Sequence, residues 1–318
     1  MKVDPRPWRD AWWDALYGPA GFYRGVEGPA GHFTTSAHGP LGAVLAAVVA
    51  HLADQAGVCR VVDLACGRGE LLAHLHDQRP DLELLGVDIV ERPSSLAPGI
   101  DWLRSAGGPA LPDELRDLDA LVLAHEWLDV VPCTIAQVDD EGVLRTVLVD
   151  EDGTETLGEE LTGEDRSWAD TWWPDARPGE RVEVGLSRDR AFADLVSRNP
   201  AGLTVAVDYG HTKATRPAQG TLTAYREGSL TEAVPDGRRD LTAHVATDSL
   251  GADEVVRQRA LLHRLGLDGA TPSHATASTD PLGYVRALGR ASSITALTDP
   301  HGLGGFHWAM TRHTRVHA

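Results

Sequence analysis

A turn with two glycines between a predicted strand and a predicted helix constrains this chain more than any other feature. The sequence Asp63-Leu-Ala-Cys-Gly-Arg-Gly-Glu-Leu71 follows an apolar run and precedes a helical pattern. Gly67 and Gly69 let the backbone bend sharply and approach a ligand closely, because glycine has no side chain. A second apolar run then ends at Asp88. This order predicts a βαβ unit, in which the two strands are parallel.

The alternation of strands and helices continues beyond this unit. We expect strands at 60–65, 82–87, 100–103, 119–124, 203–208, 220–225, 240–245 and 304–311. We expect helices at 41–52, 70–77, 188–198, 253–265 and 281–288, and a helix or turn at 112–118. The pattern therefore predicts an α/β fold with a doubly wound, mostly parallel sheet.

The pattern changes after His125. Residues 134–138 and 143–149 alternate like an antiparallel hairpin, and an acidic, tryptophan-rich segment follows. We therefore predict an insertion in the core. The expected organisation is an N-terminal helical cap at 1–50, a first part of the core at 51–132, an inserted subdomain at 133–185, and the remainder of the core at 186–318 with C-terminal helices and a strand.

The charge of the chain disfavours nucleic acid as a partner. Asp and Glu number 47 against 29 Lys and Arg, which gives a formal net charge of -18. A nucleic-acid backbone would be repelled at long range, and the sequence shows no basic cluster that would reverse the field. An acidic surface attracts a cationic substrate, although it also serves plain solubility.

Cysteine usage and the apolar runs indicate a cytoplasmic protein. Cys59, Cys66 and Cys133 have no C-x-x-C spacing, so neither a disulfide framework nor a zinc site is predicted. Residues 1–17 lack the apolar core of a secretory signal. The longest apolar run, 41–50, is half of the roughly 20 residues that span a bilayer, so no membrane segment is expected.

The glycine turn favours S-adenosyl-L-methionine over a dinucleotide. A dinucleotide-binding turn needs a third glycine where this chain has Leu72, which disfavours a nicotinamide oxidoreductase. S-adenosyl-L-methionine has no phosphate and carries an ammonium and a sulfonium, so Asp63 suits its loop. Asp88 ends the next strand, where a carboxylate can accept hydrogen bonds from both hydroxyls of an adenosyl ribose.

Further motifs follow one another along residues 20–310. They are Gly21-Phe-Tyr23 with Gly31-His-Phe-Thr-Thr-Ser36, Asp63 to Leu71, His125-Glu-Trp-Leu-Asp-Val-Val-Pro132, Asp208-Tyr-Gly210 with Gly220-Thr-Leu-Thr-Ala-Tyr225, and Asp240-Leu-Thr-Ala-His-Val245. In type and order these motifs resemble the MidA family of S-adenosyl-L-methionine-dependent methyltransferases, which includes the mitochondrial complex I assembly methyltransferase. The chain resembles a divergent member.

The resemblance implies a doubly wound, mostly parallel, seven-stranded methyltransferase core (Rossmann-like) with an N-terminal helical cap and an inserted β-rich subdomain. It also implies methylation of a protein arginine, as in the mitochondrial members. The chain departs from the family at His32, Ala37, His38, Cys66 and His125, where the family has aspartate, proline, glutamate, proline and asparagine.

These considerations give two sets of candidate site residues. The candidates for cofactor binding are Gly31, His32, Thr34, Asp63, Ala65, Gly67, Gly69, Asp88, Ile89 and His125. The candidates for catalysis are Glu126, Asp129 and His244. Methyl transfer is an in-line displacement, so the protein aligns donor and acceptor and removes a proton from a protonated amine. Glu126 and Asp129 would share one face of a helical turn and could hold a guanidinium or an amine. No metal site is predicted.

The sequence thus predicts a methyltransferase that acts on an arginine or another amine, on a protein or on a small molecule. The alternative is an assembly or interaction protein that binds the cofactor without catalysis, suggested by His32, His38 and His125 at the inferred pocket. The sequence is also compatible with a homodimer.

Overall fold

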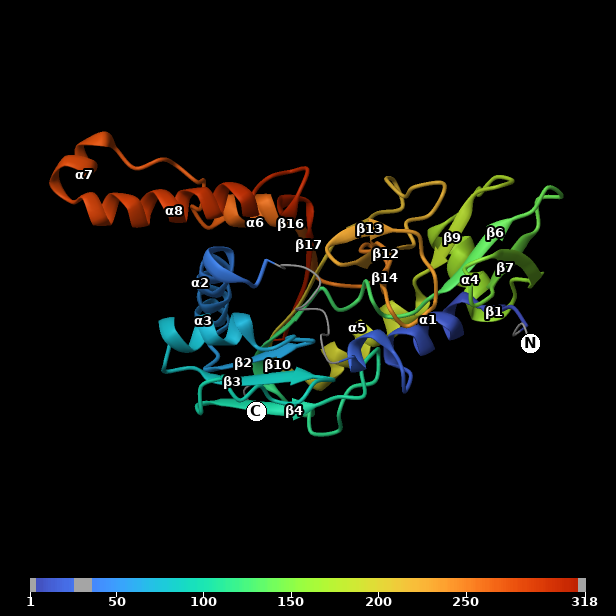
Figure 1. The fold of residues 1–318 in the computed structure, drawn as a ribbon, viewed down its shortest axis with the longest axis horizontal. Helices are drawn as coiled ribbons and strands as arrows, with labels where there is room; N and C mark the ends of the chain where they lie inside the picture. Colours follow the sequence, from blue (N-terminus) through green and yellow to red (C-terminus); the bar gives the residue numbers. More distant parts are fainter. Residues whose placement is uncertain (1–3, 26–35, 314–318) are drawn as a thin grey trace.

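The computed structural model describes residues 4–25 and 36–313, and its centre is a seven-stranded sheet (Figure 1). Across the sheet the strands are β4 (Ile100–Arg104), β3 (Glu83–Asp88), β2 (Arg60–Leu64), β5 (Asp119–His125), β10 (Ala201–Asp208), β17 (His307–His313) and β16 (Glu254–Arg257). The last strand along the chain, β17, is antiparallel to both of its neighbours, and the other six strands are parallel. The predicted α/β fold with a mostly parallel sheet is confirmed.

Helices cover both faces of this sheet. On one face pack α2 (Gly39–Ala56), α3 (Glu70–Gln78), α6 (Gln258–Arg264) and α8 (Pro281–Leu297), and on the other face packs α5 (Leu186–Arg198). Leu121 and Leu123 of β5 contact the first group, whereas Val122 and Ala124 contact the second. Because these strands are buried on both faces, their sequences are apolar throughout and do not alternate between apolar and polar residues.

Within the described ranges, α2 is the one helix long and apolar enough to cross a membrane. It packs against α3 and α8, with Val44, Val48 and Leu52 in the main hydrophobic core. Its apolar composition is therefore accounted for by its place as a core helix.

A second sheet is formed by strands that follow β5 along the chain, together with β1 from the N-terminal segment (Figure 1). It contains β1 (Arg6–Pro7), β7 (Leu144–Val149), β6 (Thr134–Val138) and β9 (Arg181–Val184), with β8 (Glu155–Glu160) paired to β7. The predicted hairpin between β6 and β7 is confirmed. On this sheet pack α1 (Trp8–Tyr17) and α4 (Gly163–Trp172).

Small elements lie between the two larger sheets (Figure 1). They are the three-stranded sheet of β12 (Thr223–Arg226), β13 (Ser229–Thr231) and β14 (Asp240–Thr242), and the pair β11 (Gly210–His211) and β15 (Val245–Ala246). The remaining elements are η1 (Phe22–Arg24), α7 (His274–Thr279) and η3 (Leu303–Gly305). The α1 helix contacts β14 as well as β6 and β7, so the N-terminal segment connects these small elements to the second sheet.

Two expected helices differ in the structure. The helix expected at 253–265 begins only at Gln258, because residues 254–257 pair with β17 as an edge strand. Val255 and Val256 are β-branched, which favours this extended conformation. The last long helix, α8, extends beyond the expected 281–288 and ends at Leu297.

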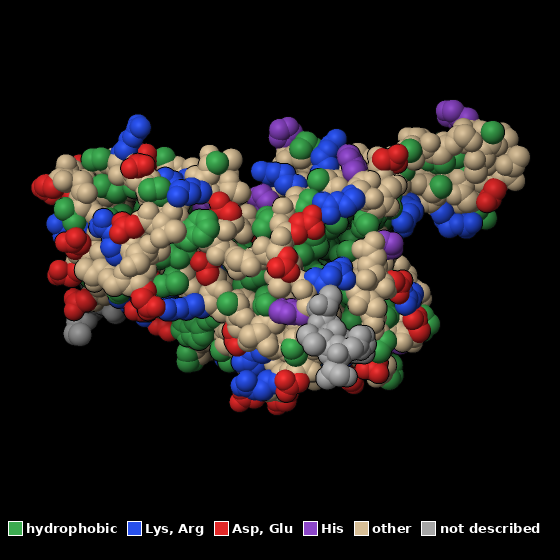
Figure 2. Space-filling model, turned by 180° about the vertical axis from the view of Figure 1, so that it is seen from behind, with side chains coloured by type: hydrophobic (Ala, Val, Ile, Leu, Met, Phe, Trp, Pro, Cys, Tyr) green, Lys and Arg blue, Asp and Glu red, His purple; other side chains and the backbone are tan. Residues whose placement is uncertain are grey.

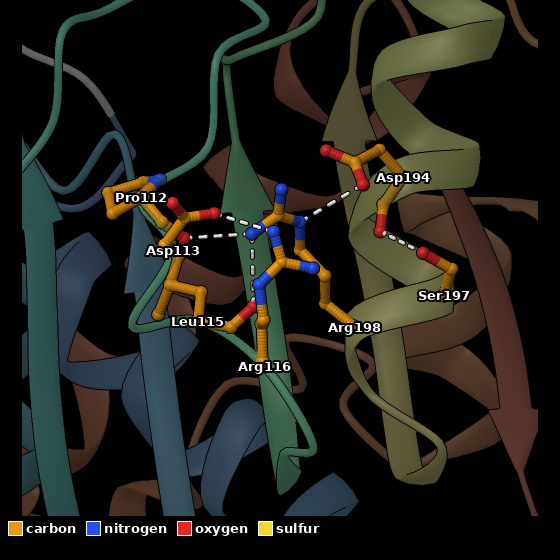
Figure 3. A network of polar contacts seen from close by, with 7 residues as sticks. All are labelled: Pro112, Asp113, Leu115, Arg116, Asp194, Ser197 and Arg198. Carbon is orange, nitrogen blue, oxygen red and sulfur yellow. Dashed lines mark hydrogen bonds and ion pairs between the residues drawn. The ribbon is translucent and has the colours of Figure 1, made fainter.

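Residues 112–118 form a turn rather than a helix, and Arg198 at the end of α5 holds it (Figure 3). The Arg198 guanidinium donates to the carbonyl oxygens of Pro112 at 2.8 Å and Leu115 at 3.3 Å. The carbonyl of Arg198 accepts from the Leu118 amide at 2.9 Å. An arginine at the end of one helix therefore satisfies the backbone groups that a further helix would have satisfied internally.

Candidate active site

A cavity of about 1310 Å³ lies where the parallel strands of the central sheet end. It is lined by most of the predicted site residues, namely Asp63, Ala65, Gly67, Asp88, Ile89, His125, Glu126, Asp129 and His244. Gly69 belongs to the same turn but caps α3 instead. Gly31, His32 and Thr34 lie outside the described residues. The carboxyl ends of parallel strands are where open α/β sheets bind their ligands.

The glycine turn after β2 has the left-handed conformation that its sequence indicated. The φ angles of Ala65, Gly67 and Gly69 are 57°, 60° and 80°. A Cβ atom on Gly69 would lie 3.0 Å from the Leu96 side chain, so this glycine allows close packing. A Cβ on Gly67 would approach only the Glu70 carboxylate, at 3.4 Å, among the described residues. The space over Gly67 is therefore open to a ligand.

Two carboxylates flank this turn. Asp88 Oδ2 accepts from the Gly67 amide at 2.8 Å and Oδ1 accepts from the Val90 amide at 3.1 Å. Each oxygen keeps a lone pair for a further donor, such as a sugar hydroxyl. Burial raises the pKa of Asp88 to about 6. Burial, reinforced by the charge of Asp88, also raises the pKa of Asp63 well above its usual range. A bound cation would relieve both costs.

The segment after β5 bends without forming the helical turn that was expected. Glu126 has a φ of 55°, and its amide donates to the Val207 carbonyl at 2.8 Å, so the pairing with β10 extends past the strand end. The expectation that Glu126 and Asp129 share a helical face is therefore wrong. Both nevertheless line the cavity, because the loop folds back over the sheet edge.

His125 precedes this bend as a buried, neutral ring. Its Nε2 lies 3.0 Å from Ser36 Oγ, and its Nδ1 lies 3.4 Å from Glu126 Oε1. Burial lowers the pKa of His125 to about 4, and its ring stacks on Phe306 with centroids 6.3 Å apart. The ring thus forms an uncharged wall beside Glu126.

Asp129 lies in a buried hydrogen-bond network. Its Oδ2 accepts from Thr242 Oγ1 at 2.7 Å and from the Tyr209 hydroxyl. Asp208 lies beside it and accepts from the Leu128 amide at 3.1 Å. Burial, followed by the charge of Asp129, raises the pKa of Asp208 well above its usual range. Two neighbouring carboxylates hold a proton more tightly than one does.

Asp240 adds a further acid at the same end of the cavity. It is 5% exposed and accepts from the Tyr23 hydroxyl at 2.6 Å. Burial raises the pKa of Asp240 to about 8, and burial with the charges of Asp129 and Asp240 raises the pKa of Glu126 to about 8. Aromatic side chains surround these acids in the cavity wall, namely Tyr17, Tyr23, Tyr209, Tyr225 and Phe306. This end of the cavity, which we call the acidic end, suits a cation.

The raised pKa of Asp240 predicts a pH-dependent stability. Because the pKa is about 8 in the folded chain against an ordinary 3.8, the folded state binds more protons than the unfolded state between these values. The free energy of unfolding should therefore fall as pH rises from about 4 to about 8. Asp240→Asn should flatten this slope and stabilise the protein at pH 8, as measured by urea unfolding across the range. Equal slopes in the two proteins would contradict a protonated Asp240.

A buried arginine holds the segments that carry the acidic end. Arg188 on α5 is 1% exposed. Its guanidinium donates to the carbonyls of Val131 at 3.1 Å, His244 at 2.7 Å and Asp129 at 2.9 Å. The same group lies 5.5 Å from the ring centre of Trp12 on α1. Arg188 thus fixes the loop after β5, the segment after β14 and the N-terminal helix relative to one another.

We expect Arg188→Met to destabilise the fold strongly. The methionine fills much of the space but leaves the carbonyl oxygens of Val131 and His244 without a donor, and the Asp129 carbonyl keeps only the Ala243 amide. The loss costs about 3 kcal/mol or more in unfolding free energy. Arg190→Met is the matched control, because Arg190 on the same helix is exposed and pairs with exposed Glu164. Its cost should stay below about 1 kcal/mol. Similar midpoints for both variants in chemical unfolding would contradict this role of Arg188.

Several residues of the site were not among the predicted site residues. Asp208, Asp240 and Tyr209 lie within the quoted motifs, so the motifs marked their segments but not their contacts. No sequence pattern indicated that Arg188 would be buried in the site, because a charged residue in an amphipathic helix is expected on the solvent side. Phe306 comes from the connection between α8 and β17, and its role depends on the position of β17 between β10 and β16.

Comparisons with known proteins agree with this geometry. A family model described as "putative S-adenosyl-L-methionine-dependent methyltransferase" matches residues 41–267, more than two thirds of the chain. No curated protein matches the chain. Two crystal structures from Burkholderia thailandensis share its fold, each with a TM-score of 0.73 and 23% identity.

The first of these structures is an uncharacterized protein, and 97% of this chain aligns with 87% of it. The second belongs to the same superfamily and contains S-adenosyl-homocysteine, with 96% of this chain aligned to 87% of it. At this identity the likeness shows the fold, whereas the family match covers the glycine turn and the acidic end. The chain therefore belongs to this family of S-adenosyl-L-methionine-dependent methyltransferases, and S-adenosyl-L-methionine is its cofactor.

Proposed function

We propose that this methyltransferase transfers a methyl group to a nitrogen of a cationic acceptor, an arginine or another amine on a protein or a small molecule. The observation that carries the proposal is the acidic end of the cavity. There the buried carboxyl groups of Asp129 and Asp240 and the half-buried carboxyl group of Glu126 lie among tyrosines and Phe306. Buried acids without a basic partner are costly, and a guanidinium or ammonium would pair with them.

The residues at the other end of the cavity fit the cofactor. Asp63 is acidic and buried, Gly67 leaves open space, and Asp88 retains acceptor capacity for two hydroxyls. Gly67 would lie against the methionine part, and Asp88 would accept from the ribose. When bound, S-adenosyl-L-methionine would supply a methyl group on a sulfonium, which a nucleophilic nitrogen can take with S-adenosylhomocysteine as the leaving group.

The acids of the chain align and deprotonate the acceptor. Glu126 Oε1 has no hydrogen-bond partner within the described part of the chain and can accept one from the acceptor nitrogen. A bound cation favours the ionised form of Glu126 despite its raised pKa. A protonated amine first loses one proton to this carboxylate, and the freed lone pair can then attack the methyl carbon, with S-adenosylhomocysteine as the leaving group. Asp129 stays fixed by Tyr209 and Thr242 and holds the charge of the acceptor.

We also propose the finer assignments that the motifs suggest. The chain would be a divergent MidA member with the seven-stranded, Rossmann-like methyltransferase core, which the six parallel strands and the antiparallel β17 support. A cytoplasmic location is supported by three cysteines that are all free. His244 lines the cavity with its ring 5.3 Å from that of Tyr209, which supports a role at the acceptor.

The proposal is tested in two steps. Calorimetry with S-adenosylhomocysteine should show binding, and the protein with S-adenosyl-L-methionine labelled in its methyl group should label an acceptor in cell lysate. Mass spectrometry of protein and small-molecule fractions then locates the label, with Glu126→Gln as the parallel control. Label on nitrogen supports the proposal, whereas label on oxygen or carbon contradicts it. Binding without any labelled product favours the assembly-protein alternative.

A further inference from the structure

The α7 and α8 helices form an arm that projects from the body of the molecule (Figures 1 and 2). Within the described chain, none of residues 281–290 at the start of α8 is buried. Three of these residues have large apolar side chains, and Leu282, Val285 and Leu288 are 72%, 65% and 38% exposed. Exposed apolar side chains gathered on one helix are a feature of contact surfaces.

One face of α8 runs along the exposed side of the arm. It consists of Leu282, Val285, Gly289, Ser292 and Ala296, which we call the α8 stripe, and all five residues are exposed. Their spacing of three or four residues places them on one side of a helix. A Cβ atom on Gly289 would meet nothing within 4 Å among the described residues. The stripe is therefore open along its length.

The sequence of α8 suits contact between two copies of an acidic protein. The chain carries a formal charge of -18, yet residues 281–298 contain no Asp or Glu. Their charged residues are Arg286 and Arg290, for which no ion pair is found within residues 4–25 and 36–313. Two copies repel each other over most of their acidic surface, and this helix brings no carboxylate into a contact between them.

The stripe is also complementary to itself. Its first half has the large side chains Leu282 and Val285, and its second half has the small residues Ser292 and Ala296. Two antiparallel copies that cross at Gly289 would place each large residue over a small one. The absence of a side chain at Gly289 would allow the helices to approach closely there. This is the pattern of a two-fold interface, in which the same patch serves both subunits.

We propose that α8 pairs antiparallel with α8 of a second copy of this chain, with the two-fold axis at Gly289. Each Leu282 then packs on the partner's Ala296, and each Val285 packs on the partner's Ser292. One helix pair lies at the low end of interface sizes, so the dimer should dissociate on dilution. The proposal is independent of the reaction that the protein catalyses.

Sedimentation equilibrium on the full chain tests this interface. The wild type should shift from monomer to dimer as its concentration rises, whereas Gly289→Glu should stay monomeric because two carboxylates would meet at the axis. This change improves helix propensity, so loss of folding would not explain the result. Arg290→Glu is the matched control, because it adds the same side chain one residue away and off the stripe, and it should still dimerise. A monomeric wild type, or a dimer unaffected by Gly289→Glu, would overturn the proposal.

Cross-linking locates the axis directly. Gly289→Cys in a Cys59→Ser background should give a disulfide-linked dimer under mild oxidation, and Arg290→Cys in the same background should not. The Cys59→Ser change removes the one exposed native thiol in the described chain. Cosedimentation with phosphatidylserine vesicles tests whether the α8 stripe binds a lipid surface instead of a second copy of the chain. A chain that stays monomeric and binds these vesicles through Val285 would show that the stripe faces lipid, and the dimer would be excluded.

Discussion

Replacing Glu126 by glutamine should lower kcat by about two to four orders of magnitude, the usual contribution of a general base. Glutamine has nearly the same shape as glutamate, so the bend at this residue and the packing against His125 should persist. What is lost is a carboxylate that accepts the proton of the acceptor nitrogen. Affinity for S-adenosylhomocysteine, measured by calorimetry, should change little, because Asp63, Gly67 and Asp88 form that part of the cavity.

The pH dependence gives a second readout for the same variant. Since the pKa of Glu126 is raised to about 8, kcat/KM for the acceptor should rise with pH up to that value in the wild type. In Glu126→Gln this rise should be absent. Asp88→Asn is the contrasting variant, which should weaken cofactor affinity with a smaller effect on kcat. If Glu126→Gln weakened cofactor binding as much as it lowered turnover, Glu126 would belong to the cofactor-binding residues instead.

Gly67→Val should abolish measurable binding of S-adenosyl-L-methionine while leaving the chain folded. Because no other described group but Glu70 lies near a Cβ at this position, the new side chain would fill the ligand space rather than clash with the core. The φ of 60° also disfavours a β-branched residue, and strain of this kind costs about 1–3 kcal/mol. Calorimetry with S-adenosylhomocysteine measures the loss, and far-UV circular dichroism checks the fold.

Gly57→Val separates the effect of backbone strain from the effect of a side chain that fills the cofactor space. Gly57 ends α2 with a φ of 71°, and a Cβ there would have open space among the described residues. It does not line the cavity. This variant should therefore have a similar loss of stability and unchanged cofactor affinity. Retained binding in Gly67→Val, or lost binding in Gly57→Val, would contradict the assignment of the turn.

The first half of the core could be predicted from local patterns. Apolar runs that end in glycine or aspartate mark β2 and β3, and the turn between them needs no distant residue to take its conformation. The β6–β7 hairpin was predicted for the same reason, because its alternation and its turn lie within sixteen residues. Elements whose partner is adjacent in the chain are those that periodicity detects well.

The rest depended on contacts between distant residues. Residues 254–257 were assigned to a helix because their pairing with β17, more than fifty residues away, cannot be read locally. The acidic end was predicted only in part, because Asp240 and Asp208 reach it through the position of β14 and the end of β10. Arg188 shows the limit most clearly, since its partners are three backbone carbonyls, which carry no residue-specific signal in a sequence.

The place of β17 between β10 and β16 has a consequence for biosynthesis. Residues 307–313 emerge from the ribosome after all the other strands of the sheet, yet they pair with both β10 and β16. Until they are made, a nascent chain exposes two unpaired strand edges, the kind of surface that recruits foreign strands or chaperones. The same holds for a premature stop upstream of these codons, which would remove only a few per cent of the chain but detach β16 from a sheet reduced to five strands.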